Sequence, residues 1–177
     1  MQNHKNFHIF LICVAIFLVV SVLLTLKFET RAAVINWSGS GVTNNWSEGA
    51  NWSGGVAPGS NDVATFSSLS TKDVTIDQNI NVSGINVQSS YTGTISQGGS
   101  LVTIGSGNYS QAGGAWTGGT TKIDINDGSF TLSGGTFSAP TLTGTASSID
   151  VEKNLTISGG TFSATNATTS FDGPGNL

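Results

Sequence analysis

The chain repeats itself, and this internal repetition constrains its fold more than any other feature of the sequence. Segments 109–116, 130–137 and 155–162 share a large apolar first residue, a Gly-Gly pair four residues later and an aromatic last residue. Their first residues are 21 and 25 positions apart. Each segment is typical of two short strands joined by a tight turn, because glycine readily adopts the positive φ angles of chain reversals. A period of roughly 20 to 30 residues built from short strands predicts one turn of a β-solenoid.

A second register supports the same period. It is centred on Ile76, Ile104, Ile123, Ile149 and Phe171, with a mean spacing of about 24 residues. Around these positions apolar and polar residues alternate, which places the apolar side chains on one face of a strand. Stacked turns would pair each strand with its equivalent about 4.8 Å away. The second register therefore predicts that these five residues lie one above another.

Composition excludes several classes of function. From Val34 to Leu177 there is no His, Cys, Arg or Met, and the basic residues are Lys72, Lys122 and Lys153 against nine acidic residues. Three lysines cannot neutralise a row of phosphates, so we expect no nucleic-acid partner. Zinc and thiol chemistry lack their ligands, a Ser-His-Asp triad lacks its His, and no disulfide can form. We therefore expect a protein that is not an enzyme.

Disorder is the alternative to a solenoid. From residue 34 onward, Leu, Ile, Val and Phe make up 30 of 144 residues, which is close to the range in which chains stop folding. Disordered chains are usually highly charged and lack patterned β-branched residues, whereas this chain carries few charges and alternates regularly. The pattern therefore favours a folded all-β domain.

Residues 1–33 have the organisation of an export segment. An apolar run without charged residues spans 9–26, and the small-residue site that ends at Ala32 and Ala33 resembles a signal-peptidase recognition sequence. The run is also just long enough to span a membrane. Two alternatives stay open: a signal peptide cleaved near Ala32/Ala33, or a retained single-span anchor. In both, residues 34–177 are exported, extracellular or at the cell surface, and only the N-terminal segment contacts a membrane.

Segment 34–66 differs from the repeats because it is rich in tryptophan. Trp37, Trp46 and Trp52 each lie between Asn and Ser. In the first interpretation they cap the N-terminal end of a solenoid that occupies 67–177, because repeat folds need capped ends. The alternative is a carbohydrate-binding module in which the indole faces stack on sugar rings. Cell-surface glycans or other envelope components are the expected partners.

Four aspartates recur beside the central residues of the second register: Asp77, Asp124, Asp150 and Asp172. Stacked turns would arrange them as an acidic column, for which Ca²⁺ is the matching cofactor because it prefers hard oxygen ligands. The alternative, which we favour, is an exposed polar position at the end of each strand. Asp150 also lies two residues before Glu152, a spacing that would place both carboxylates on one strand face for glycoside hydrolysis. We assign no catalytic residue on this pair alone.

The C-terminal residues match the start of an earlier unit. Gly175–Leu177 corresponds to Lys153–Leu155, about one period earlier in the chain. An open last turn exposes unpaired backbone groups, so a solenoid needs a partner or further turns at such an end. We expect the repeats to be truncated there, with further domains of a longer protein after Leu177.

Residues 51–66 (NWSGGVAPGSNDVATF) resemble the opening of bacterial surface proteins with autotransporter-type β-strand repeats. The unit Phe130–Phe137 and the ending Ser170–Asn176 are similar to the repeats of large envelope proteins of the same kind. The resemblance implies a right-handed parallel β-helix, of about five to six turns, that serves as an extracellular stalk or adhesin. The sequence thus predicts a non-enzymatic surface repeat protein, with carbohydrate binding by the tryptophans as the alternative function.

Overall fold

A computed structural model describes residues 32–143, 147–165 and 167–171. Apart from Ala32 and Ala33, the expected export segment lies outside these residues, as do Asp172 and the matching end at 175–177. Within them the chain is all-β, with sixteen short strands and one 3₁₀ helix, η1 (Gly49–Asn51). No helix in these ranges is long and apolar enough to cross a membrane.

The strands form three parallel sheets. Sheet 1 contains β1 (Val34–Asn36), β2 (Val63–Phe66), β5 (Gly84–Val87), β8 (Tyr109–Gln111), β11 (Phe130–Leu132) and β14 (Leu155–Ile157). Sheet 2 contains β3 (Val74–Thr75), β6 (Thr94–Ser96), β9 (Ala115–Thr117), β12 (Thr136–Ser138) and β15 (Thr161–Ser163). Sheet 3 contains β4 (Ile80–Val82), β7 (Val102–Ile104), β10 (Ile123–Ile125), β13 (Ile149–Val151) and β16 (Thr169–Phe171).

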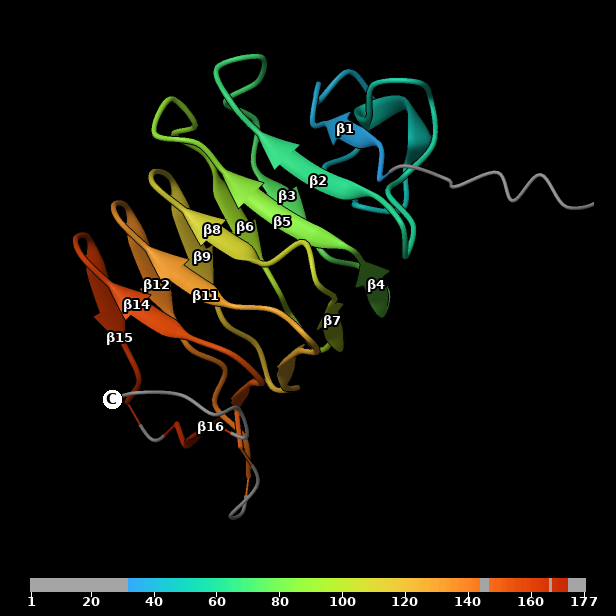
Figure 1. Ribbon diagram of the computed structural model, residues 1–177. Helices are drawn as coiled ribbons and strands as arrows, with labels where there is room; N and C mark the ends of the chain where they lie inside the picture. Colours follow the sequence, from blue (N-terminus) through green and yellow to red (C-terminus); the bar gives the residue numbers. More distant parts are fainter. Residues whose placement is uncertain (1–31, 144–146, 166, 172–177) are drawn as a thin grey trace, which may run out of the picture. The chain divides into compact units, whose positions relative to one another are not determined.

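The chain visits the three sheets in the same order in every turn. Turn 1 consists of β2, β3 and β4, and turn 5 consists of β14, β15 and β16, so that the strands stack into a parallel β-solenoid of five turns (Figure 1). Each strand pairs in parallel with its equivalents in the neighbouring turns, which satisfies the backbone N–H and C=O groups. The predicted all-β solenoid is confirmed, with the lower of the two expected numbers of turns.

The core consists of columns of equivalent side chains inside the stack. In sheet 2 the inward column contains Val74, Ile95, Trp116, Phe137 and Phe162. Its last three rings stack almost parallel, at 5.9 Å for Trp116–Phe137 and 5.6 Å for Phe137–Phe162. Because each side chain is covered by its equivalents above and below, strands of only three residues bury a continuous apolar column.

The Gly-Gly pairs of segments 109–116, 130–137 and 155–162 form the corner between sheets 1 and 2. The second glycine of each pair has a positive φ, 58° at Gly114, 74° at Gly135 and 76° at Gly160. A Cβ added to Gly135 would lie 2.5 Å from the carbonyl oxygens of Gly113 and Gly114 in the preceding turn. A side chain is therefore excluded there both by backbone conformation and by the close approach of neighbouring turns.

The structure confirms the first sequence register. The leading residues Tyr109, Phe130 and Leu155 are partners in sheet 1. The closing aromatic residues of the same three segments are partners in sheet 2. The repeat read from the Gly-Gly pairs is therefore the true structural period.

The second register is partly wrong. Ile123 pairs with Ile149 as predicted, but Ile104 pairs with Ile125 rather than with Ile123. Phe171 is likewise displaced by two residues, onto Val151. The predicted member Ile76 follows β3 and lies outside sheet 3. The reason is that most strands of sheet 3 carry two inward apolar residues two positions apart, so that their pattern fits two registers, and corner length decides between them.

Candidate functional site

The three tryptophans that were predicted to cap the solenoid or to bind sugars are all buried at its N-terminal end. The exposed fractions are 0%, 1% and 2% for Trp37, Trp46 and Trp52. Trp52 meets the other two rings edge to face, at 4.6 Å from Trp46 and 5.0 Å from Trp37. All three rings pack against Phe66 of β2. The arrangement has the form of a cap, because no indole face is left open for stacking on a sugar ring.

Backbone pairing joins this cap to the solenoid. β1 adds a sixth strand to sheet 1. Asn45 bridges Thr75 of β3 in parallel and so extends sheet 2 by one residue pair. The indole N–H of Trp52 donates to the carbonyl of Trp46 at 2.7 Å. The cap therefore covers the N-terminal edges of two sheets, which would otherwise expose backbone groups.

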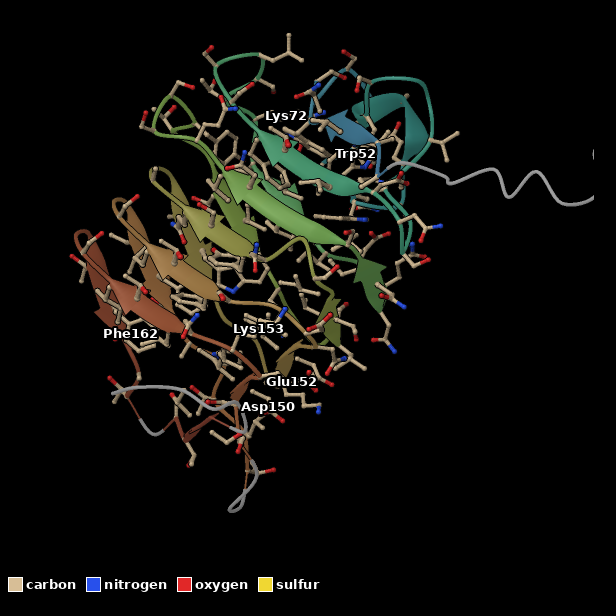
Figure 2. All side chains as sticks on the ribbon, in the orientation of Figure 1. Trp52, Lys72, Asp150, Glu152, Lys153 and Phe162 are labelled. Atoms are coloured by element: carbon tan, nitrogen blue, oxygen red, sulfur yellow. The ribbon has the colours of Figure 1, made fainter. Side chains whose placement is uncertain are left out.

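Lys72 holds the cap loop from within, close to Trp52 in Figure 2. Its ammonium donates hydrogen bonds of 2.7 to 3.2 Å to three backbone carbonyls of loop 39–43. Its own carbonyl accepts from the Trp37 indole at 3.0 Å and from the Tyr91 hydroxyl at 2.9 Å. Burial raises the pKa of Tyr91, which keeps its hydroxyl a donor at physiological pH. Lys72 thus ties the tryptophan cluster, the loop and turn 1 together.

Glu48 and Asn51 close the same loop from its other side. The Glu48 carboxylate accepts from the N–H groups of Val42 and Thr43, at 2.8 and 2.7 Å, and from the Thr43 hydroxyl. These hydrogen bonds, with that of the Thr43 hydroxyl foremost, hold the pKa of Glu48 below its usual 4.5. The buried Asn51 side chain donates to the carbonyls of Thr43 and Asn45.

These polar residues of the cap were not predicted from the sequence. The Lys72 ammonium donates hydrogen bonds to backbone carbonyls. Because every residue has such a carbonyl, residue types do not reveal these partners. The one signal in the sequence was that Lys72 is the single basic residue between positions 34 and 121. A lone lysine in a chain of small polar residues is a candidate for a buried-loop contact rather than for a charged surface.

Asp77 connects the cap to turn 1. Its carboxylate accepts hydrogen bonds from the N–H of Ser47 at 3.0 Å and from the Ser47 hydroxyl. Partial burial acts to raise the pKa of Asp77, but the hydrogen bonds from Ser47 outweigh it and lower that pKa below the usual 3.8. The observed contacts of Asp77 are therefore those of a structural tether.

The three described aspartates of the four proposed for calcium, Asp77, Asp124 and Asp150, do not align as one column. Asp124 and Asp150 are direct partners between β10 and β13, but the next positions in this column are Thr103 and Ser170. Asp172 lies outside the described residues. Among the described residues of the expected column, only Asp124 and Asp150 stack, because the second register was displaced.

Each carboxylate of this pair has a side-chain partner, a lysine for Asp124 and a serine hydroxyl for Asp150. Lys122 forms an ion pair with Asp124 at 2.9 Å, and the Ser170 hydroxyl donates to Asp150 at 2.7 Å. The hydrogen bond with Asp124 raises the pKa of Lys122. Among the residues that the structure describes, no three His, Cys, Asp or Glu side chains gather to hold a metal ion. Calcium binding therefore stays a prediction from the sequence alone.

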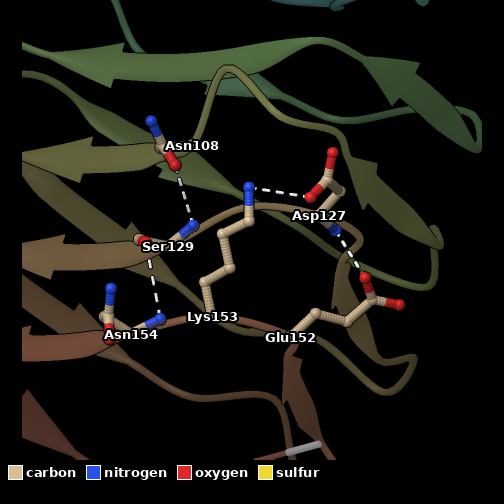
Figure 3. Close-up of polar contacts among 6 residues, drawn as sticks. All are labelled: Asn108, Asp127, Ser129, Glu152, Lys153 and Asn154. Carbon is tan, nitrogen blue, oxygen red and sulfur yellow. Dashed lines mark hydrogen bonds and ion pairs between the residues drawn. The ribbon is translucent and has the colours of Figure 1, made fainter. Parts of the chain in front are cut away.

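Asp150 and Glu152 do not share a strand face. β13 ends at Val151, and Glu152 lies in the following corner, where its carboxylate accepts from the Asp127 N–H at 2.6 Å (Figure 3). Lys153 in the same corner pairs with Asp127 at 2.7 Å. The observed contacts of Glu152 and Lys153 join neighbouring turns and do not form a two-carboxylate catalytic site.

The outward side of sheet 2 carries small residues in two columns, which we name the hydroxyl face. The first column contains Thr94, Ala115, Thr136 and Thr161, and the second contains Thr75, Ser96, Thr117, Ser138 and Ser163. Strand geometry separates neighbours within a column by about 4.8 Å and the two columns by about 7 Å. No charged or aromatic side chain points outward from β6, β9, β12 or β15. From turn 2 to turn 5 the hydroxyl face is therefore a regular, uncharged array; in turn 1 the first column continues to the exposed Asp73, whose carboxylate accepts from the Thr94 N–H at 2.7 Å.

No protein-family model, curated protein or solved structure matches the chain. The structure itself establishes the β-solenoid, and the likeness to bacterial autotransporter-type repeats rests on the sequence. Function is therefore best argued from the faces and the two ends of the solenoid.

Proposed function

We propose that this chain is an exported, non-enzymatic repeat protein of the cell surface that acts as a stalk or adhesin. The observation that carries the proposal is the hydroxyl face, where Ser and Thr side chains, interrupted by one Ala, lie in register from turn to turn. Such a face offers many equivalent, individually weak contacts on a rigid frame, and weak contacts that are linked in this way add to a useful avidity. Its partners are uncharged polymers of a cell envelope, such as surface glycans.

The chemistry of the remaining residues agrees with this role. From Val34 onward the chain has no His, Cys or Arg, and the carboxylates of Asp150 and Glu152 are engaged in structural hydrogen bonds. The tryptophans are buried in the cap and offer no sugar platform. Contact with glycans therefore belongs to the hydroxyl face in this proposal and not to the tryptophan cluster.

The experiment tests adhesion in a multivalent format. Beads coated with the protein are applied to films of neutral insoluble polysaccharides, and the bound fraction is compared with that of soluble monomer. We expect beads to bind and monomer to bind weakly. Ser138→Glu places a charge on the hydroxyl face and should reduce bead binding several-fold. The matched control, Thr156→Glu, changes an equally exposed outward residue on sheet 1 and should leave binding unchanged.

Two results would overturn the proposal. Equal loss of binding for both charged variants would show that the hydroxyl face has no special part in adhesion. In a secreting bacterial host, an epitope tag placed after Leu177 should be removed by protease added to intact cells. A surface protein of the same host serves as the control for protease action. If that protein is cleaved while the tag resists the protease, the assignment to the cell surface is contradicted.

A further inference from the structure

The side chains of Lys72 and Asn51 meet where the cap joins turn 1, in the region where Figure 2 shows Lys72 and Trp52. The Lys72 side-chain nitrogen lies 3.5 Å from the Asn51 side-chain oxygen. The amide carbon is bonded to that oxygen at about 1.2 Å, so small side-chain rotations bring it to the attack distance of about 3 to 3.5 Å. Asn51 is the last residue of η1, and Lys72 stands 21 positions later, just before β3. The fold thus holds an amine and a carboxamide next to each other.

Hydrogen bonds at both ends of the Asn51 amide fix its orientation. Its oxygen accepts from the Gly41 N–H at 2.8 Å. Its nitrogen donates to the carbonyls of Thr43 and Asn45, at 3.1 and 3.0 Å. The side chain is 0% exposed, which protects the amide from hydrolysis by bulk water. The Gly41 N–H is also placed to stabilise negative charge that develops on the amide oxygen when a nucleophile attacks the carbon.

Glu48 adds a carboxylate to this pair. One of its oxygens accepts from the Asn51 side-chain nitrogen at 3.4 Å. The hydrogen bonds to Glu48 described above, and then the nearby charge of Lys72, hold the pKa of Glu48 below its usual 4.5. Glu48 is therefore ionised at neutral pH. A carboxylate beside both groups can take a proton from the amine and pass it to the amide nitrogen.

Lys72 differs from the other two lysines of the solenoid in what its amine contacts. Lys122 and Lys153 form ion pairs with aspartates. The Lys72 nitrogen is instead fixed by three carbonyls of loop 39–43, with the Asn51 amide beside it. Only the neutral amine is a nucleophile. A small neutral fraction is sufficient here, because the reaction occurs once per molecule and the amine stays positioned at the amide.

From these contacts we propose that Lys72 and Asn51 join in an intramolecular isopeptide bond, which the folded cap forms without another protein. The Lys72 side-chain nitrogen attacks the Asn51 amide carbon, and a C–N bond forms while charge gathers on the oxygen beside the Gly41 N–H. Glu48 accepts a proton from the attacking nitrogen and donates it to the Asn51 side-chain nitrogen. The bond from the amide carbon to that nitrogen then breaks. An ammonium group and an amide thus become a new amide and an ammonium ion, so that no oxidant, reductant or co-reactant is consumed.

The bond would lock the cap onto turn 1. It closes segment 51–72, which includes β2, into a covalent loop, and such a cross-link restricts the unfolded chain. A force that pulls on the two ends of the chain would pass through the cross-link and would not extend β2. This property suits a surface stalk, but the inference depends only on the geometry of the cap and holds whatever the hydroxyl face binds.

Mass spectrometry of the full chain tests for the bond. The intact mass should be lower than the mass of the sequence by one ammonia molecule. After denaturation, trypsin should fail to cut after Lys72, because a lysine whose amine has become an amide is not a substrate. A protease that cuts before Asp62 and Asp73 should release two fragments that stay joined, one with Asn51 and the other with Lys72. The joined fragments locate the bond, since other residues can also lose ammonia.

Three variants assign the chemistry. Lys72→Arg keeps a positive charge and hydrogen-bond donors but carries no nucleophilic amine, so the joined fragments should disappear. Glu48→Gln removes the proton acceptor and should lower the joined fraction at least about tenfold at a fixed time after folding. The matched control, Lys122→Arg, changes a lysine that pairs with Asp124 and should leave the joined fragments in place. Circular dichroism shows whether each variant keeps its β structure.

Two results would overturn the proposal. The first is a folded parent chain that has the full mass of its sequence and is cut by trypsin after Lys72, a result that needs no variant. The second is a loss of ammonia that persists in Lys72→Arg, because the ammonia would then come from another residue. Neither result bears on adhesion by the hydroxyl face, which the coated beads test separately.

Discussion

The first and the last described turns of the solenoid differ in how far their apolar side chains are covered. At the N-terminal end, sheets 1 and 2 are covered by residues that occur once, namely three tryptophans and a lysine-centred loop. In turn 5, the last turn that the structure describes, Ile157 and Phe162 are partly exposed. The contrast shows that repeated residues can specify the inside of a stack but not its termination. A solenoid ends where residues that do not belong to the repeat cover the backbone groups and apolar side chains of its outermost turn.

The largest expected effect on stability comes from removing one aromatic side chain at each end. Trp52→Ala removes the central ring of the cap and should lower the free energy of unfolding by about 3–5 kcal/mol. Phe162→Ala, which removes a ring that is already partly exposed, should lower it by about half as much. Urea denaturation of both variants measures the difference. Equal losses would show that the cap contributes no more than an ordinary turn.

Glycine substitutions separate two reasons why a position needs glycine, namely a positive φ angle and the close approach of the neighbouring turn. Gly135→Ala combines a φ of 74° with a Cβ that would lie 2.5 Å from two carbonyl oxygens, and should destabilise by about 2–4 kcal/mol. Gly54→Ala in the cap has a φ of 92° but no atom within 4 Å of the new Cβ, and should cost about 1–2 kcal/mol. Thermal unfolding of the two variants separates the steric effect from the backbone effect. A larger loss at Gly54 would contradict the close approach of turns described above.

Lysine substitutions compare a cap contact with a contact between repeats. Lys72→Met keeps the aliphatic stem but leaves carbonyls of loop 39–43 without their donor, and should destabilise by about 1–3 kcal/mol. Lys153→Met breaks an exposed ion pair with Asp127 and should cost less than about 1 kcal/mol. Chemical denaturation provides the measurement for both variants. If the two losses are the same, Lys72 does not organise the cap.

The smallest expected effect is a dependence of the cap on pH. Hydrogen bonds lower the pKa of Glu48 in the folded chain below the usual 4.5, so that its contribution is complete above about pH 4.5 and is lost as the pH falls through the folded pKa. Tryptophan fluorescence followed from pH 7 to pH 2 should report loosening of the cap in that range. Glu48→Gln should weaken the cap at neutral pH and flatten this dependence. A steeper loss in the variant than in the parent would contradict the assignment.

The sequence was sufficient for the period of the solenoid but not for all of its registers. The Gly-Gly pairs aligned Tyr109, Phe130 and Leu155 correctly, because in these three segments the pair stands at the same distance from a large apolar residue before it and an aromatic residue after it. Sheet 3 was misaligned at Ile104, because alternating apolar residues fit equally well after a shift of two. The expected acidic column failed for the same reason.

The cap shows a different limit of sequence reasoning. The tryptophans were recognised as candidates for a cap because aromatic residues carry a strong and specific signal. Lys72 and Glu48 were not recognised, because their partners are backbone groups and hydroxyls that any sequence can supply. The two buried glutamines, Gln97 and Gln111, were overlooked in the same way, although each bonds carbonyls of a neighbouring corner. Polar contacts of this kind are decided by the path of the chain and not by residue type.

The stacking order has a consequence for how the chain reaches its final form. Inter-turn hydrogen bonds of the repeats join residues about 20 to 25 positions apart, and the longest side-chain reach in the cap, from Trp37 to Lys72, spans 35 positions. A polypeptide that leaves a narrow channel with its amino terminus first can therefore complete the cap once turn 1 has emerged, and then add each turn onto a finished template. Once the cap has closed, folding and emergence can advance at the same pace, with no more than about one turn of loose chain outside the channel at a time.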